Sequence, residues 1–478
     1  MVQSDLTPSG QAQSLYAARE PVFPKAVSGV FRRLKWWIMG LCLAVYYLTP
    51  WLRWDRGPYM PNQAVLVDLG NRRFFFFWIE IWPQEFYYVG GLLIMAGLGL
   101  FLFTSVLGRV WCGYACPQTV WVDLYQHIER WVDGDRNAQF RLLKRRWDSY
   151  KLRRRALKWG IWLLIAVATG GAWVFYFDDA PTLFAALFTG QAHYIAYATV
   201  AILTATTFVL GGFLREQVCI YMCPWPRIQG AMLDENSLLV TYKDWRGEPR
   251  GKHRKSTTAD QLGDCIDCNA CVAVCPTGVD IREGQQIGCI TCALCIDACD
   301  DIMRKIGKPR GLIDYCTLAD EGNERAGGKP VPVWRRIIRL RTGIYFLLWS
   351  LIGLTMLVAL FMRQDIDLGV EPERNPTFIT LSDGRIRNAY TLRIKNMSGE
   401  PAPFQLSVTG GYYMQPDLQG IDGLTVTVPA DETAKLRLFL TTVPWFNMPE
   451  RFEVQIWAEN LNTRDRTSYD THFMGPEQ

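Results

Sequence analysis

The hydrophobic positions of this 478-residue chain form two patterns, long uninterrupted runs in the first three quarters and strict alternation in the last quarter. Five runs are free enough of charge, and long enough, to cross a hydrocarbon layer of about 30 Å. They predict five membrane-spanning helices, at residues 36–52, 86–107, 159–177, 192–214 and 342–362.

Basic residues beside these runs predict their orientation. The stretch from Arg141 to Lys158 holds nine Lys and Arg residues against one acid, whereas the loop 178–191 holds no basic residue. Positive residues are enriched in cytoplasmic loops, so we expect a multi-pass protein of the bacterial cytoplasmic (inner) membrane. The expected topology has a cytoplasmic N-terminus, cytoplasmic segments 108–158 and 215–341, and a periplasmic segment 363–478.

The runs divide the chain into five predicted parts. The first run follows Arg32, Arg33 and Lys35 and has no small-residue cleavage site, so it is interpreted as a retained anchor and not as a signal peptide. The parts are a cytoplasmic tail (1–35), four transmembrane helices (36–230), a cytoplasmic cysteine-rich domain (231–341), a fifth helix (342–362) and an exported domain (363–478).

The exported segment alternates apolar and polar residues, which is typical of strands with one buried face. Short strands at near-regular spacing over about 110 residues are the pattern of an immunoglobulin-like sandwich, here without its disulfide. Nothing in this all-β segment indicates catalysis, so we expect a docking or shielding module. The predicted strands are 391–395, 405–408, 424–428, 435–440 and 452–457.

Eight of the fourteen cysteines form two runs with the same spacing, Cys-x-x-Cys-x-x-Cys-x-x-x-Cys. In bacterial ferredoxins with this spacing, three cysteines of one run and the fourth of the other bind each 4Fe–4S cluster. The sequence therefore predicts two 4Fe–4S clusters in a dicluster ferredoxin insert of α+β fold, which transfers single electrons. One ligand set is Cys265, Cys268, Cys271 and Cys299, and the other is Cys289, Cys292, Cys295 and Cys275.

Zinc and disulfides are the alternative uses of clustered cysteines. Zinc needs four ligands per site and does not explain a doubled run whose first copy ends in Cys275-Pro276. Cys316 is the last cysteine, so the expected exported segment has none, and iron–sulfur ligands have to remain reduced thiolates. Cysteine placement thus agrees with the orientation predicted from the basic residues.

A second pair of cysteine motifs has the form Cys-x-x-x-Cys-Pro. Each motif follows two predicted spans and an arginine, so the order span, span, motif occurs twice. Cysteines four residues apart lie on one helical face, and internal repeats commonly meet at a shared central site. The sequence predicts that Cys112, Cys116, Cys219 and Cys223 form one four-thiolate site at the cytoplasmic membrane surface.

The sequence leaves open what this four-thiolate site binds. Soft thiolates favour Cu(I), zinc or an iron–sulfur cluster over hard ions, and Met222 adds a thioether beside Cys223. Packing cysteines and a reversible disulfide are the structural alternatives, but duplicated thiol pairs rarely serve packing alone. We expect a redox or metal role, with copper or a third 4Fe–4S cluster as the ligand.

Other candidate residues carry weaker signals. The stretch 120–132 predicts an amphipathic helix along the membrane surface with His127 on its polar side. Cys42 and Cys316 have no partner in sequence and are expected to pack, and the weaker alternative for Cys42 is a copper pair with Met39, since both are soft donors. The sequence shows no Gly-rich phosphate loop and no Ser/His/Asp constellation, so we expect electrons from a partner or a diffusible donor on the cytoplasmic side.

The order of these parts resembles a known family. Two units of two spans and CxxxCP, a dicluster ferredoxin, a last span and an immunoglobulin-like tail resemble CcoG, also called FixG or RdxA. These are cytochrome c oxidase accessory proteins of the cytoplasmic membrane. The matching stretches are 74–88 (FFFFWIEIWPQEFYY), 108–118 (GRVWCGYACPQ), 275–282 (CPTGVDIR), 289–301 and 308–311 (KPRG).

The resemblance implies a membrane cupric reductase that converts Cu(II) to Cu(I) for assembly of a cbb-type haem–copper oxidase. The four CxxxCP thiols would then lie near copper, and the eight ferredoxin cysteines would supply electrons. The implied partners are the membrane, a copper transporter or chaperone, and oxidase assembly factors, and the chain could also form a homo-oligomer. The basic segment 246–255 is expected to reflect membrane topology and not nucleic-acid binding.

Two other functions fit the same residues. The chain could be an electron-transfer subunit that reduces another membrane or periplasmic partner and never handles copper. It could also be a non-catalytic assembly scaffold, whose clusters sense redox state and whose sandwich domain docks oxidase subunits.

Overall fold

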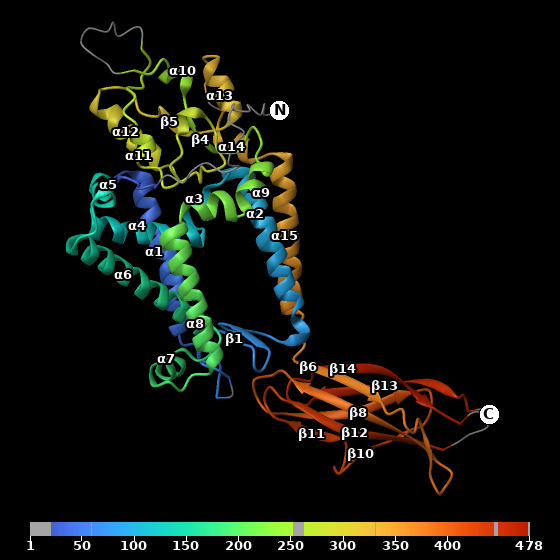
Figure 1. Cartoon of the computed structure of the whole chain (residues 1–478). Helices are drawn as coiled ribbons and strands as arrows, with labels where there is room; N and C mark the ends of the chain where they lie inside the picture. The colour runs from blue at the N-terminus through green and yellow to red at the C-terminus, as the bar shows by residue number, and fades with distance from the viewer. Residues whose placement is uncertain (1–20, 59, 252–261, 330, 444–447, 477–478) are drawn as a thin grey trace, which may run out of the picture. The chain divides into compact units, whose positions relative to one another are not determined.

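The computed structural model describes residues 21–476, apart from residues 59, 252–261, 330 and 444–447 (Figure 1). The chain divides into two compact units. The first unit comprises the residues up to 50 and residues 84–352, and the second comprises residues 51–83 and the residues from 353 onward. The loop 51–83, which the sequence placed between two spans, therefore belongs with the C-terminal domain.

In the described residues, four helical stretches are long and apolar enough to cross a membrane, and they agree with four of the five predicted spans. The third predicted span is part of a longer helix, because α6 begins inside the basic stretch that precedes it. The four are α2 (Tyr87–Leu107), α6 (Ser149–Val174), α8 (Tyr194–Thr207) continued by the π-helix η3 (Phe208–Leu214), and α15 (Leu340–Phe361).

The predicted count of five spans is not confirmed, because α1 (Val30–Leu48) is not among these helices. Its first turns carry Arg32, Arg33 and Lys35, and two of these, Arg32 and Lys35, are buried. Only residues 36–48 continue without a charge, which is about 20 Å of helix at 1.5 Å per residue. That length is shorter than a hydrocarbon layer of about 30 Å.

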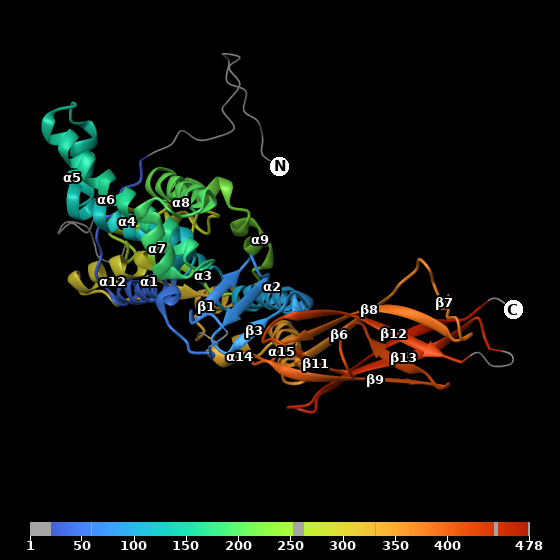
Figure 2. The same cartoon turned by 90° about the horizontal axis from the view of Figure 1, so that it is seen from below.

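Close packing of α6 against α8 and α4 (Pro117–Asp133) organises the helices of the first unit (Figures 1 and 2). Gly170 lies where α6 meets α8, and a Cβ atom there would be 2.8 Å from the carbonyl oxygen of Val200. The glycine pair that interrupts the third hydrophobic run therefore permits close approach of two helices. Between α6 and α4, the ring of Trp162 stacks on that of Tyr125 at 5.3 Å.

Short helices and turns complete the helical part of the first unit. They connect the longer helices and carry both CxxxCP motifs. They are α3 (Val110–Tyr114), α5 (Arg136–Lys144), α7 (Ala180–Thr189), the π-helix η4 (Val218–Met222) and α9 (Trp225–Met232).

The cysteine-rich domain is built around a two-stranded antiparallel sheet, in which β4 (Leu239–Tyr242) pairs with β5 (Ile313–Cys316). Its core contains both apolar residues and cysteines. Val240, Ile296 and Leu312 are buried in one cluster with Cys265 and Cys271. The helices of this domain are α10 (Asp244–Gly247), α11 (Ala270–Ala273), α12 (Leu294–Lys305), α13 (Leu318–Arg325) and α14 (Val333–Ile337).

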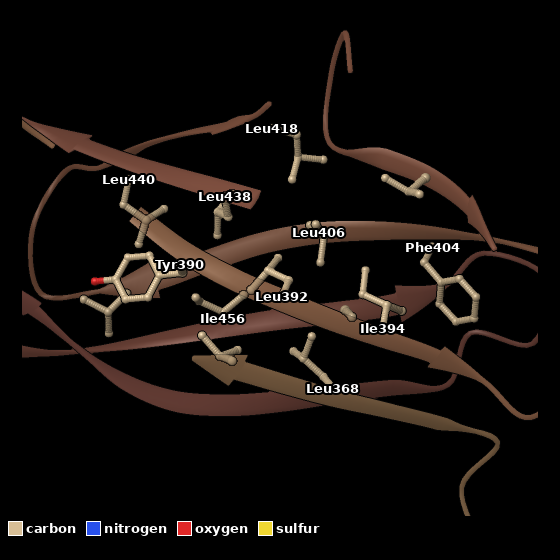
Figure 3. Packing of buried hydrophobic residues seen from close by; sticks show 14 of the residues in the cluster. Leu368, Tyr390, Leu392, Ile394, Phe404, Leu406, Leu418, Leu438, Leu440 and Ile456 are labelled. Carbon is tan, nitrogen blue, oxygen red and sulfur yellow. The ribbon is translucent and has the colours of Figure 1, made fainter. Parts of the chain in front are cut away.

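The second unit contains a β-sandwich, as the alternating pattern predicts. One sheet has the order β10-β12-β8-β6, with β7 on β8, and the other has the order β11-β9-β13-β14. Inward leucines, isoleucines and aromatic residues of the two sheets fill the space between them, among them Leu392, Leu406 and Ile456 (Figure 3). The strands are β6 (Ile366–Pro372), β7 (Ile379–Thr380), β8 (Ile386–Asn396), β9 (Ala402–Gly410), β10 (Gln415–Leu418), β11 (Thr425–Val428), β12 (Thr433–Thr442), β13 (Arg451–Asn460) and β14 (Arg466–Met474).

All five predicted strands are confirmed, within β8, β9, β11, β12 and β13. The sequence analysis missed β6, β7, β10 and β14. β10 and β14 consist mostly of polar residues, and β14 buries only Thr471 and Phe473, so they lack the clear alternation that identified the others. β6 does alternate, with Ile366, Leu368 and Val370 buried, and this signal was overlooked.

The loop 51–83 forms a small three-stranded antiparallel sheet of β1 (Val65–Asp68), β2 (Arg73–Phe76) and β3 (Ile79–Ile81). Arg73 lies 3.4 Å from the carboxylate of Asp431, and the Lys395 ammonium lies 3.7 Å from the centre of the Trp82 ring. The loop is therefore held to the sandwich by ion pairs and cation–π contacts.

Candidate functional site

The first ferredoxin ligand set lines one cavity in the cysteine-rich domain. Cys299 comes from α12, and the other three cysteines come from the loop before and the start of α11. The walls are apolar, with Met303, Leu312 and Ile313 among the lining residues. The four cysteines at this cavity are Cys265, Cys268, Cys271 and Cys299, the set predicted from the spacing.

The second ligand set lines a neighbouring cavity. It holds Cys275 from the first run together with three cysteines of the second run, Cys289, Cys292 and Cys295. Cys271 lies at the edge of the same cavity, so the two cavities adjoin. The fourth cysteine of each run thus reaches the other run's cavity, the crossover that is typical of dicluster ferredoxins.

The two cysteine runs wind with the same unusual backbone. In both runs, the residues on either side of the second cysteine have positive φ. They are Asp267 and Asn269 around Cys268, and Thr291 and Ala293 around Cys292. Left-handed backbone is costly for residues such as Thr and Ala. Because this backbone conformation recurs at matching positions of both runs, it indicates that the two loops are shaped to surround a bound group.

Arg282 stabilises the loop of the first cysteine run through hydrogen bonds. Its guanidinium donates to the carboxylates of Asp267 and Asp280, each at 2.6 Å, and its side chain is largely buried. It also donates to the side-chain oxygen of Asn269 at 2.5 Å. Arg282 therefore holds both left-handed residues that flank Cys268.

Burial disfavours the thiolate form of three ferredoxin cysteines. It raises the pKa of Cys271 and Cys292 to about 11 and that of Cys299 to about 12. Iron–sulfur clusters bind thiolates, so loading the site has to release these protons. The charge of the iron, and not the protein alone, therefore has to stabilise the thiolates.

The donor set fits 4Fe–4S clusters. Each cavity holds the four cysteines of one predicted ligand set and has apolar walls, and in a cluster each thiolate binds its own iron. In the part of the chain that the structure describes, no group of three or more His, Cys, Asp or Glu side chains is arranged around a single metal-ion position. Spread thiols around a cavity suit a cluster and not one zinc ion.

The CxxxCP cysteines do not lie on one continuous helical face, and that expectation was wrong. Cys112 is in α3 and Cys219 is in η4, but Cys116 and Cys223 are extended residues just beyond these short helices. The reason is the proline after each second cysteine, because the residue before a proline avoids helical backbone. Each motif therefore spans a junction between two helices.

The structure nevertheless brings the two CxxxCP pairs together. Cys112 interacts electrostatically with Cys116 and Cys223, and Cys219 interacts with all three other thiols. The Cys112 thiol donates to the side-chain oxygen of Gln229, on α9 of the second repeat, at 3.0 Å. All four cysteines are half-buried. Burial raises the pKa of Cys112 to about 11 and of Cys219 to about 12.

The first CxxxCP motif packs directly on the second cluster loop. The hydroxyl of Tyr114 donates to the carbonyl of Cys292 at 3.1 Å. A Cβ atom on Gly113 would lie 2.7 Å from the carbonyl oxygen of Ile290, so only glycine fits there. Cys112 itself packs against the apolar cluster that contains Ile290 and Cys292.

The second motif also reaches the cluster loop. Cys219 lines a small cavity together with Pro276 and Thr277, which directly follow Cys275. Both CxxxCP motifs therefore adjoin the second ferredoxin site, and neither lines the first.

A buried row of polar residues on α4 was missed by the sequence analysis. The sequence predicted an amphipathic helix along the membrane surface with His127 on its polar side. His127 is exposed and its ring meets that of Trp36 edge-on at 4.6 Å, but the acids of α4 point into the protein. The buried residues are Asp123, Gln126, Glu129 and Asp133.

The partners of this row come from distant parts of the chain. Arg32 donates to both oxygens of Asp123, at 2.8 and 2.9 Å, and Lys158 lies 2.8 Å from Glu129. The nearby cations lower the pKa of Asp123 and Glu129 against the opposing effect of burial. The spacing of polar residues at three- and four-residue intervals was the available signal, because they share one helical face.

Three described residues of the predicted N-terminal tail, Lys25, Phe31 and Arg32, contact the ferredoxin domain. The backbone amides of Phe31 and Arg32 donate to the carboxylate of Asp297 at 3.3 and 2.7 Å. Lys25 donates through its amide to the carbonyl of Ala273 at 2.8 Å. Residues 1–20 lie outside the described part of the chain.

The remaining candidate residues take structural places. Cys316 and Met39 are buried and Cys42 is half-buried, as expected of packing residues. Met222 is 59% exposed, so its thioether is open to solvent or lipid. In the basic segment 246–255, of which residues 252–255 lie outside the described chain, Arg246 pairs with a carboxylate of the ferredoxin domain.

Three family models match this chain. A 4Fe-4S dicluster domain matches residues 214–318, and the immunoglobulin-like fold at the C-terminus of FixG matches residues 356–476. A 4Fe-4S binding domain matches residues 89–147, which include Cys112 and Cys116. The matches agree with the ferredoxin and sandwich domains of the structure.

Relatives in this family are similar over nearly the whole chain. Protein RdxB of Cereibacter sphaeroides is 61% identical, over 98% of this chain and 99% of its own. Protein RdxA of the same organism is 60% identical, over 90% and 91%. Nitrogen fixation protein FixG of Rhizobium meliloti is 50% identical, over 97% and 94%. With its apolar helices and iron–sulfur domains, this chain is therefore a membrane iron–sulfur redox protein that belongs to the FixG/RdxA family.

Proposed function

We propose that this chain passes electrons through its ferredoxin domain to the CxxxCP thiols and reduces Cu(II) to Cu(I) there, for assembly of a cbb-type haem–copper oxidase. Clusters bound in the two cavities would supply one-electron carriers. The observation that carries the proposal is the contact between the first CxxxCP motif and the loop of Cys292. Contact of this kind gives electrons a short path between the two thiol sites.

The protein's part in copper reduction is selective binding of the product. Copper takes up one electron, and the thiolates of the CxxxCP site prefer the soft Cu(I) ion over Cu(II). Tighter binding of the reduced ion raises the tendency of bound Cu(II) to accept an electron. Cu(I) would then pass to a copper transporter or chaperone.

The proposed sidedness places the ferredoxin domain in the cytoplasm and the sandwich in the periplasm, with α1 as a fifth crossing. The amide of Lys25 bonds to the ferredoxin domain just before α1, and residues 51–83 after α1 belong to the unit of the sandwich. If the two domains lie on opposite sides, the chain has to cross the membrane between these segments. The basic residues before α1 and α6 support the cytoplasmic assignment.

Iron analysis and Cu(II) reduction on anaerobically purified protein test this proposal. Dithionite would supply electrons and a Cu(I)-specific chelator would report the product. We expect reduction by the wild type and its loss in Cys112→Ser and Cys219→Ser, with iron content unchanged. Cys42→Ser is the matched control, because Cys42 is a half-buried cysteine of α1 outside both thiol sites.

Failure of these assays would point to the other functions. Reduced clusters without Cu(II) reduction would leave an electron-transfer subunit for another partner. If cysteine substitution removes the clusters but changes neither electron transfer nor oxidase assembly, a redox role is excluded. The chain would then be a scaffold.

A third 4Fe–4S cluster at the CxxxCP thiols is the second candidate for this site. The observation that favours it is the match of a 4Fe-4S binding domain to residues 89–147. The absence of a single-ion arrangement among the described thiols agrees with it. In that case the wild type holds about twelve irons and the Cys112→Ser, Cys219→Ser double variant holds about eight, since a cluster has four irons.

A further inference from the structure

A cavity of about 340 Å³ lies in the first unit beside α4, α6 and η3, apart from the ferredoxin cavities. Its walls include four aromatic rings, those of Phe23, Trp159, Trp162 and Phe213. The Phe213 ring lies 5.9 Å from that of Trp159 and 6.1 Å from that of Trp162. The volume is in the lower part of the range of about 300–1,000 Å³ for small-molecule sites. The cavity therefore suits one planar ring system.

The charges at this cavity are balanced. Its three cations already have carboxylate partners on α4. Arg155 pairs with Asp133 at 3.4 Å, Lys158 with Glu129 at 2.8 Å and Asp133 at 2.7 Å, and Arg215 with Glu129 at 2.8 Å. Glu216 adds a further acid to the lining. No positive charge is in excess, so the cavity favours a neutral ligand over a phosphate or a lipid head group with negative charge.

The cavity adjoins the redox site. Arg215 and Glu216 line it and also line the small cavity that contains Cys219 and Thr277. Gln126, which is 3% exposed, lines that small cavity too, and its amide nitrogen has no hydrogen-bond partner within the structure. A buried donor without a partner costs free energy, so it points to a polar ligand atom on this side.

The cavity lies where two apolar helices meet the segments that the sequence predicts to be cytoplasmic, because Phe23, Leu143 and Arg155 also line it. Trp159 and Trp162 belong to α6, and Phe213 belongs to the π-helix that continues α8, both of them long and apolar enough to cross a membrane. A ligand dissolved in the membrane could therefore enter it. Segments of π-helix occur frequently at functional sites.

We infer that this cavity binds a membrane quinol and that the quinol is the reductant of the CxxxCP and ferredoxin sites. A quinol is neutral, planar, aromatic and soluble in lipid, and its two hydroxyls can donate to buried carboxylates. The inference rests on the proposed function, and it replaces the expected cytoplasmic donor by one in the membrane.

The reaction balances without a further reagent. One quinol loses two O–H protons and two electrons and becomes a quinone. The electrons leave one at a time toward Cys219 and the second ferredoxin site and reduce two Cu(II) to two Cu(I). The carboxylate of Glu216 is placed to accept the protons one after the other and release them to water, because it lines the cavity.

Anaerobic reduction of the full-length, cluster-loaded protein in phosphatidylcholine vesicles tests the inference. Decylubiquinol is the probe and dithionite the reference reductant, and cluster reduction is followed by electron paramagnetic resonance. We expect decylubiquinol to reduce the clusters of the wild type. Trp159→Leu and Glu216→Gln should slow this reduction about tenfold or more, because single pocket contacts discriminate between ligands on that scale. Reduction by dithionite and iron content should stay at the wild-type level.

Trp173→Leu is the matched control. Trp173 also lies on α6, but its ring contacts Phe177 at 5.6 Å and it does not line the cavity. We expect its rate with decylubiquinol to equal that of the wild type. Equal slowing in Trp173→Leu and Trp159→Leu would overturn the inference, because the effect would then not depend on the cavity.

Different results would overturn the copper proposal and the quinol inference. If dithionite supports Cu(II) reduction but decylubiquinol reduces no cluster, the quinol inference is overturned and the proposed function stands. If neither reductant supports Cu(II) reduction although decylubiquinol reduces the clusters, the copper proposal fails and the quinol site stands. A co-purifying phospholipid that Trp159→Leu releases, with no reduction by decylubiquinol, would show a lipid site instead.

Discussion

The hydroxyl of Tyr114 donates a 3.1 Å hydrogen bond to the backbone carbonyl of Cys292. This bond joins the middle of the first CxxxCP motif to a ligand residue of the second cluster site, although the two residues lie 178 positions apart. Gly113 brings the two backbones close enough for it. The contact between the two thiol sites therefore depends on Gly113 and Tyr114, which are neighbours in the first motif.

Replacing Gly113 by alanine should separate the two sites. The added Cβ would lie 2.7 Å from the Ile290 carbonyl oxygen and 2.9 Å from the Cys292 Cα, so α3 has to move. We expect electron transfer from reduced clusters to Cu(II) to slow by about tenfold or more, measured by stopped-flow absorbance, since misplacement of this size can cost about a hundredfold in rate. Gly90→Ala on α2 is the control, because a Cβ there has no atom within 4 Å. An unchanged rate in Gly113→Ala would show that this contact is not the path.

The crossover of ligands can be tested by pairs of cysteine substitutions. Cys265→Ser and Cys299→Ser should remove the same cluster, because both cysteines line the first cavity. Cys275→Ser and Cys292→Ser should remove the other. Each variant should keep about four of eight ferredoxin irons, with matching Mössbauer or paramagnetic resonance spectra within each pair. Spectra that pair Cys265 with Cys275 would contradict the crossover.

Removal of the Lys158 charge should destabilise the helical part of the first unit. Its ammonium lies between Glu129 and Asp133 at 2.8 and 2.7 Å, and all three side chains are almost fully buried. Breaking a buried ion pair from one side typically costs about 3–5 kcal/mol, so Lys158→Met should lower the melting temperature in detergent clearly. Lys144→Met, at an exposed position of α5, is the control and should melt like the wild type. Equal melting of both variants would show that the carboxylates do not need this partner.

The second unit should lose stability as the pH rises from 4.5 to 7. Burial, with the nearby Asp431 carboxylate as a second cause, raises the pKa of Glu80 from 4.5 to about 7. The folded state therefore holds this proton more tightly than the unfolded state, so folding is favoured at low pH and the advantage disappears as pH passes about 7.

Hydrogen exchange of residues 65–81 in the full-length chain measures this effect. Comparing the wild type with Glu80→Gln at each pH removes the intrinsic pH dependence of exchange. We expect the two proteins to exchange alike at pH 5 and the wild type to exchange faster at pH 8, because glutamine has no charge to bury. Faster exchange of Glu80→Gln at pH 8 would mean that the ionised carboxylate stabilises the loop through Arg73.

The ferredoxin thiol sites could be predicted because their cysteines lie close together in the sequence. Both CxxCxxC loops bring three ligands to one cavity within seven residues, so spacing alone identifies them. The apolar runs and most alternating strands were predicted for the same reason, since burial of one face produces a periodic pattern. The ligand crossover followed from the resemblance of the spacing to bacterial ferredoxins.

Other features could not be predicted because they depend on residues that meet only in the folded chain. The acids of α4 are buried because Arg32, Lys158 and Arg215 come from three other segments to pair with them. Without those partners the same row of acids would need contact with water. The loop 51–83 likewise joins the sandwich through contacts of Arg73 and Lys395 that no local pattern records.

The sequence by itself thus determined the two kinds of thiol site, the apolar helices and the β-sandwich, because each rests on short-range spacing or periodicity. Only the tertiary structure decided that Tyr114 and Gly113 meet the loop of Cys292 and that a cavity with balanced charge adjoins Cys219. These contacts join segments more than a hundred residues apart, and their geometry is set by how the helices pack and not by any one segment.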